Sequence, residues 1–146
     1  MAALAAAALL MIFPERIFAA DYRYYKIYYF SEADAGLSLF DSEEFGFCGA
    51  FTAEQIAEVL FTNLIDRGAV PGGTKLISAD IRGQTLFLNF SKEFLGYGGS
   101  MTERAIVREL AKTAAEIPGV SRLTVLVGGA SGPLAEGTLV REMELG

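Results

Sequence analysis

A glycine-rich segment, Gly96 to Ser100, is the part of the sequence that comes nearest to a phosphate-binding loop. A dinucleotide-binding loop requires a glycine where this chain has Met101, and a nucleoside triphosphate-binding loop requires a lysine where it has Gly99. The same residues suit the start of a helix in which Ser100 is the N-cap and Glu103 completes a capping box. We therefore predict a capped helix here and no bound cofactor.

Catalysis in this chain would depend on carboxylates, because the sequence contains no histidine. Without histidine there is no Ser-His-Asp or Cys-His nucleophile and no histidine-based zinc site. Asp80 and Glu93 come nearest to a hydrolase pair, which needs two carboxyl groups roughly 5 to 9.5 Å apart in a cleft. A carboxylate-dependent glycan hydrolase is therefore the alternative function, and exposed or capping roles are the favoured interpretation of both residues.

Neither the acidic cluster nor the cysteine has the pattern of a reactive site. Asp41, Glu43 and Glu44 lack the alternating oxygen ligands and central glycine of an EF-hand loop, so we predict a solvated loop and no metal. Cys48 lies among apolar residues in the stretch FGFCGAF, where a thiol is more often an inert small hydrophobe than a nucleophile.

Length and charge limit the class of protein. With 146 residues, of which 52% are hydrophobic, the chain is long enough for one domain with a core. The excess of carboxylates gives a net charge of −6, which repels nucleic acid unless the basic residues are grouped into a patch. We therefore expect no nucleic-acid partner.

The N-terminus resembles a signal segment. Residues 1 to 13 are an unbroken apolar run that Pro14 ends well short of the ~20 residues needed to span a bilayer. We therefore expect residues 1–20 to be an apolar export segment and residues 21–146 to form a single domain. An apolar helix that packs on the domain is the alternative, and membrane contact is expected only through this segment if it is not cleaved.

The remaining pattern predicts strands and two helices in one α+β unit. Thr52 and Gln55 form a capping box that starts the first helix, and Gly68 ends it. Alternating apolar residues predict the strands: residues 22–30, a short strand at 36–40, a hairpin of 76–81 and 85–90 with the loop 82–84, residues 120–129, and a short edge strand within 138–145. We predict a mixed β-sheet with two helices packed on one face.

The second predicted helix carries a basic stripe. Arg104, Arg108 and Lys112 recur at intervals of four, opposite the apolar face of the helix, and Glu109 and Glu116 are placed to relieve the charge of Lys112. A solvated helix face is the default interpretation. The alternative is a docking surface for an acidic partner or a second copy of the chain.

Four stretches within residues 24–145 together match a known module: YYKIYYF, LISADIRGQTLFLNFSKEF, GGSMTERAIVRELAKT and IPGVSRLTVLVGG. The most specific pieces are Phe90-Ser91 after the hairpin, Gly99-Ser100 with Glu103 at the helix start, and Gly119-Val120 before the last long strand. In these stretches the chain resembles the GerMN domain of the GerM family of sporulation and spore-germination proteins.

The resemblance implies a non-catalytic module that acts outside the cytoplasmic membrane. Such a module would bind an envelope or sporulation protein, or associate with itself, and would use no cofactor. This chain holds one copy of the domain where some members carry two, and no cysteine follows the apolar run as in a lipoprotein signal. A cell-wall glycan hydrolase is the alternative.

Overall fold

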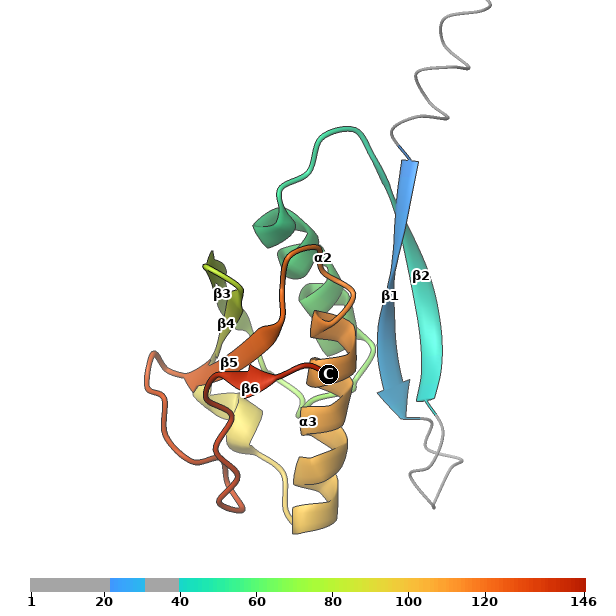
Figure 1. Cartoon of the computed structure of the whole chain (residues 1–146). Coiled ribbons are helices and arrows are strands. Elements are labelled where there is room, and N and C mark those ends of the chain that lie inside the picture. The colour runs from blue at the N-terminus through green and yellow to red at the C-terminus, as the bar shows by residue number, and fades with distance from the viewer. Residues whose placement is uncertain (1–21, 31–39) are drawn as a thin grey trace, which may run out of the picture.

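The computed structural model describes residues 22–30 and 40–146 and confirms the α+β class (Figure 1). The elements of the described part are β1 (Tyr22–Phe30), β2 (Phe40–Cys48), α2 (Ala53–Asp66), β3 (Leu76–Arg82), β4 (Thr85–Phe90), the 3-10 helix η1 (Lys92–Leu95), α3 (Ser100–Ala114), β5 (Arg122–Val127) and β6 (Met143–Glu144).

Strands β3 to β6 form the predicted mixed sheet, in that order. β4 runs parallel to β5, and the other two neighbouring pairs are antiparallel. A parallel pair needs a long crossover between its strands, and α3 lies in the connection from β4 to β5. The predicted C-terminal edge strand is present as Met143–Glu144.

The β3–β4 hairpin is present, with a tighter turn than predicted. β3 continues through Arg82, which pairs with Thr85, so the loop consists of Gly83 and Gln84 rather than three residues. Gly83 has a φ of 60°, in the left-handed region that glycine adopts without a steric penalty. This conformation allows the two-residue connection between the strands.

The first strand pairs with the acidic segment for which the sequence predicted a loop. β1 and β2 form a separate two-stranded antiparallel sheet, in register from Tyr22 with Cys48 to Phe30 with Phe40. The predicted solvated loop is therefore wrong, because Asp41, Glu43 and Glu44 all lie in β2. The predicted short strand overlaps β2 only at Phe40, and its residues 36–39 lie outside the described part.

Pairing with β1 explains how an acidic segment forms a strand. Alternation places Phe47 on the face towards the helices, where its side chain is buried. Glu43 lies on the same face, and its carboxylate forms an ion pair of 3.1 Å with Arg67. Arg67 also donates a hydrogen bond to the hydroxyl of Tyr29 and lies 4.4 Å from the centre of its ring. The strand therefore buries Phe47 and leaves its acids in solvent or beside a cation.

Helix α2 begins with the predicted capping box. The amide of Gln55 donates to the Thr52 hydroxyl at 3.1 Å, and the amide of Thr52 donates to the Gln55 side chain at 3.0 Å. These bonds confirm Thr52 as the N-cap. Gly68, with a φ of 84°, follows the end of the helix as predicted.

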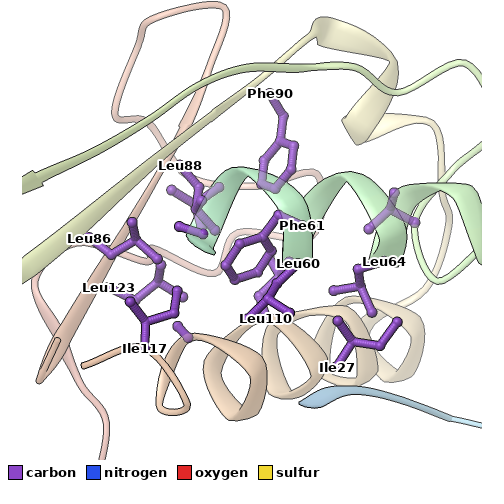
Figure 2. Close-up of a cluster of buried hydrophobic side chains, with 14 of the residues drawn as sticks. Ile27, Leu60, Phe61, Leu64, Leu86, Leu88, Phe90, Leu110, Ile117 and Leu123 are labelled. Atoms are coloured by element: carbon purple, nitrogen blue, oxygen red, sulfur yellow. The ribbon is translucent and has the colours of Figure 1, made fainter. Parts of the chain in front are cut away.

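The core lies between the four-stranded sheet and the two helices, and Figure 2 shows its central side chains. They include Leu60, Phe61 and Leu64 of α2, Leu86, Leu88 and Phe90 of β4, Leu110 of α3, Leu123 of β5, and Ile117. The two helices therefore pack on one face of the sheet, as predicted.

The β1–β2 hairpin lies on the other side of the helices from the four-stranded sheet (Figure 1). Ile27 of β1 is fully buried against the helices from this side. The helices are therefore a middle layer between two sheets, which the sequence analysis did not predict.

The predicted export segment, residues 1–20, lies outside the described residues. In the part of the chain that the structure describes, no helix is both long and apolar enough to cross a bilayer.

Candidate functional site

Helix α3 holds the free edge of β1 with polar side chains. One edge of β1 pairs with β2, and three backbone amides on the other edge donate to side chains on or just after α3. Phe30 donates to Glu109 at 2.9 Å, Tyr28 to Thr113 at 3.0 Å, and Lys26 to Glu116 at 3.0 Å. These acceptors satisfy amides that an edge strand would otherwise expose, so α3 takes the place of a neighbouring strand.

Glu109 is the member of this row with an unsatisfied oxygen atom. Its side chain is buried, and Oε1 accepts the Phe30 amide while Oε2 has no hydrogen-bond partner. Burial disfavours the charged form and raises the pKa of Glu109 to about 7, although the bond from Phe30 acts in the opposite direction. Glu109 therefore changes its charge within the physiological range of pH.

The basic stripe lies beside the aromatic residues of the hairpin. Arg104, Arg108 and Lys112 are all exposed. The Arg108 guanidinium lies 5.3 Å from the centre of the Phe30 ring and 5.2 Å from that of Phe40. The Lys112 ammonium lies 5.3 Å from the centre of the same Phe40 ring. Two of the three predicted cations are thus held by aromatic rings, at distances where cation–π attraction is favourable.

A groove runs past these two cations. It has a volume of about 440 Å³ and separates the exposed side of α3 from the C-terminal segment. Its lining residues are Phe40, Val107, Arg108, Ala111, Lys112, Ala115, Met143, Glu144, Leu145 and Gly146. The groove therefore combines a largely apolar floor with two positive charges held over aromatic rings, and it also contains the carboxylate of Glu144. The apolar floor and the two cations suit a segment with both apolar and acidic side chains.

The start of α3 differs from the prediction. Gly99, with a φ of 92°, is the N-cap, and no side chain caps the helix. Glu103 does not reach back to a cap but is buried, with 1% of its surface exposed. The predicted Ser100–Glu103 capping box is therefore wrong, because Glu103 has stronger partners elsewhere in the fold.

Those partners come from two loops. The Tyr97 hydroxyl donates to Glu103 at 2.7 Å, and the backbone amides of Glu136 and Thr138 donate at 2.6 and 2.8 Å. Burial alone would raise the pKa of Glu103, but bonds from Thr138, Tyr97 and the backbone outweigh it and lower that pKa to about 2. Burial and the bond to Glu103 raise the pKa of Tyr97. Glu103 is thus a charged anchor for the loop before β6.

The other residues singled out by the resemblance have structural positions. Ser91 continues the β3–β4 pairing, since its hydroxyl accepts the Lys75 amide at 2.8 Å and its own amide donates to the Lys75 carbonyl at 2.9 Å. The Gly99 amide donates to the Glu136 side chain at 3.0 Å. Gly119 has a φ of 79° in the turn before β5. None of these contacts forms a binding cleft.

The structure does not bring the proposed catalytic pair together. Asp80 pairs with Phe87 near the turn of the β3–β4 hairpin and lines a groove beside α2. Glu93 lies in η1, which follows the opposite end of β4, and it does not line that groove. A hydrogen bond from Ser91 lowers the pKa of Glu93. The carboxylates on which the hydrolase alternative rested therefore share no cleft.

Cys48 is exposed at the end of β2, so its side chain is not buried as a small hydrophobe. That its thiol is inert stays a prediction. Alternation along the strand turns its buried neighbour Phe47 inward and Cys48 outward. Among the described residues, no three His, Cys, Asp or Glu side chains are grouped as metal ligands.

The polar row that meets β1 was not predicted from the sequence. Glu109 and Glu116 were predicted to relieve the charge of Lys112, and Thr113 was not among the predicted site residues. Residues 109, 113 and 116 are spaced by four and three, which places them on one side of a helix. A polar row next to an apolar face is the signal that a second element contacts the helix there.

Comparisons with known proteins agree with this arrangement. The fold is similar to that of the first GerMN domain of the sporulation protein GerM from Bacillus subtilis, with a TM-score of 0.60 and 18% identity over 84% of this chain and 97% of that chain. The tandem GerMN domains of the same protein match with a TM-score of 0.58 and 19% identity over 84% of this chain and 45% of that chain.

A crystal structure of a lipoprotein candidate from Clostridium perfringens also has this fold, with a TM-score of 0.58 and 20% identity over 86% of this chain and 89% of that chain. None of the curated proteins matches the chain by sequence. The family model named Germane, described as sporulation and spore germination, matches residues 26–132. The chain therefore belongs to the Germane family of sporulation and spore-germination domains.

Proposed function

We propose that this chain is a non-catalytic domain that acts outside the cytoplasmic membrane and binds a protein of the cell envelope or of a sporulation assembly. The apolar run of residues 1–13 and the fold shared with a lipoprotein candidate support export. The family description supports a role in sporulation or germination. Residues 21–146 form the domain in this proposal, and residues 1–20 direct export or anchor it.

The observation that carries the binding proposal is the groove beside α3. Arg108 and Lys112 stand over aromatic rings at its edge, while Val107, Ala111 and Leu145 supply apolar surface. Side chains already held in place lose less conformational entropy on binding than free ones. Arg108 and Lys112 are therefore already ordered when an acidic partner, or the acidic surface of a second copy of this chain, binds to them.

Charge reversal tests this proposal. In the triple variant, Arg104, Arg108 and Lys112 are each replaced by Glu. The triple variant should no longer bind the partner. A higher salt concentration should likewise weaken binding of the wild type, because salt screens the same charges. A matched control reverses three exposed cations that do not line the groove, replacing Lys75, Arg82 and Arg141 by Glu.

The measurement is recovery of partners from cells, with sedimentation equilibrium to detect self-association. Circular dichroism must first show that both variants keep their helices, because the reversed side chains also lose their ring contacts. If the triple variant and the control recover the same partners in the same amounts, α3 carries a solvated face and no docking surface. Mass spectrometry of the mature N-terminus tests export, and cytoplasmic protein that retains Met1 would contradict it.

A further inference from the structure

A second concave site lies at the open end of the β1–β2 hairpin. It is a cavity of about 300 Å³ between the hairpin and the start of α2. Its lining residues are Arg23, Tyr25, Phe47, Gly49, Ala50, Phe51 and Ile56. It is separate from the α3 groove, with which it shares no residue.

Aromatic rings form the walls of this cavity. Phe47 packs edge-on against Tyr25 with ring centres 5.5 Å apart and against Phe51 at 5.1 Å. Tyr25 and Phe47 are buried, while Phe51 is exposed over 44% of its surface. Two rings are therefore fixed in the fold, and the third remains available for contact with a ligand.

The surface around the cavity is also rich in aromatic residues. Tyr22 and Tyr24 lie on the outer face of the same hairpin end, with ring centres 5.2 Å apart. They are exposed over 46% and 59% of their surface. Tyrosine and arginine are the residue types that most often dominate the energy of protein interfaces. Their concentration at one end of a small domain indicates a recognition surface.

Among the described residues that line the cavity, Arg23 is the only one with a charge. Within the described part of the chain, the structure contains one ion pair, between Arg67 and Glu43, so no described carboxylate neutralises Arg23. Its guanidinium therefore favours an anionic group next to whatever fills the cavity.

We infer that this cavity binds an acidic peptide segment of a partner protein by taking up one large apolar side chain. The aromatic walls select the apolar side chain, and Arg23 selects a neighbouring carboxylate. A volume of about 300 Å³ is at the lower end of the range for ligand sites, which suits a single side chain better than an extended molecule. This inference goes beyond the proposed function and does not depend on the α3 groove.

Tryptophan fluorescence provides a direct test, because the chain contains no tryptophan. The probes are two blocked peptides that each carry one central tryptophan, flanked by aspartates in one and by lysines in the other. On binding the full-length wild-type chain, the acidic probe should shift its emission to shorter wavelength and bind about tenfold more tightly than the basic one. The net charge of −6 favours the basic probe, so a preference for the acidic probe must come from a local cation.

Two variants and one control locate the binding. Ala50→Leu fills the cavity from an exposed loop position and should weaken binding of the acidic probe about tenfold. Arg23→Glu should remove the preference for the acidic probe. Arg122→Glu makes the same charge change on β5, away from the cavity, and should leave the affinity within about twofold of wild type.

Three results would overturn the inference. The first is failure of the wild type to bind the acidic probe, and the second is equal affinity of wild type and Ala50→Leu. The third uses vesicles of phosphatidylcholine and phosphatidylglycerol. In that result, Ala50→Leu and Arg23→Glu each reduce the amount of protein that sediments with the vesicles but leave the affinity for the acidic peptide unchanged. That result would identify the aromatic end as a membrane contact. The triple reversal on α3 should leave probe binding unchanged, so failure of one site does not imply failure of the other.

Discussion

Replacement of the buried carboxylate of Glu103 by an amide should destabilise the protein by about 3 kcal/mol at pH 7. In Glu103→Gln, one oxygen remains to accept from Thr138, while the other is replaced by an NH₂ group that cannot accept from Tyr97 or Glu136. Hydrogen bonds to charged groups contribute about 1.5 to 3 kcal/mol each, and donors left unpaired in a buried site add to the cost.

The pKa of Glu103 expresses the effect of the same hydrogen bonds as a free energy. The fold lowers this pKa from 4.5 to about 2, and at about 1.4 kcal/mol per unit the difference corresponds to roughly 3 to 4 kcal/mol. Because the folded-state pKa lies below the unfolded value, this stabilisation is present above about pH 4.5 and is lost as the pH falls towards 2. The difference between wild type and variant should therefore shrink below about 1 kcal/mol near pH 2.

Urea unfolding followed by far-ultraviolet circular dichroism at several pH values measures this difference. Glu136→Gln is the matched control, because that side chain is exposed and accepts one bond, from the Gly99 amide. The control should lose less than about 1 kcal/mol at any pH. A difference for Glu103→Gln that stays the same from pH 7 to pH 2, or that is no larger than that of the control at pH 7, would refute the reasoning.

Other perturbations give further tests. The fold raises the pKa of Glu109 from 4.5 to about 7, so the folded state binds this proton more tightly than the unfolded state does. The resulting contribution to the free energy of unfolding is complete below pH 4.5 and is lost as the pH rises through 7. Glu109→Gln should therefore be more stable than wild type by about 1 to 3 kcal/mol at pH 8, but not at pH 4.5, in urea unfolding. Thr52→Ala should cost about 1 kcal/mol in thermal unfolding, whereas Ser100→Ala should cost less than about 0.5 kcal/mol, since only Thr52 caps a helix. Thr113→Val should speed hydrogen exchange of the Tyr28 amide, and unchanged exchange would show that this bond does not hold β1.

Two capping boxes with the same spacing were predicted from the sequence, and only one exists. The Thr52–Gln55 box forms, and within the described part of the chain neither side chain has another hydrogen-bond partner. At the start of α3, Tyr97 and the loop before β6 provide buried donors for Glu103, and these hold the carboxylate more strongly than a cap amide would. Local sequence cannot separate the two cases, because the competing donors come from up to 35 residues away along the chain.

The pairing of β1 with β2 was not predicted from the sequence, for a similar reason. The acidic residues of β2 have low strand propensity, and their pairing with β1 depends on contacts from other elements. Arg67, after α2, pairs with Glu43, and α3 satisfies the far edge of β1. The β3–β4 hairpin was predictable because alternation and a glycine turn specify it locally. The groove beside α3 could not be predicted from the sequence, because its lining residues include Phe40 of one sheet and Met143 of the other.

The two kinds of charge on α3 have separate tasks. Glu103 and Glu109 are buried and bind backbone amides of other elements, whereas Arg108 and Lys112 stay exposed over rings of the hairpin. Substitution of the acids should therefore change stability and its dependence on pH. Substitution of the cations should change association and its dependence on salt, with little effect on unfolding. If reversal of the cations lowered stability as much as loss of Glu103, the ring contacts would be part of the scaffold, and the partner would have to bind elsewhere.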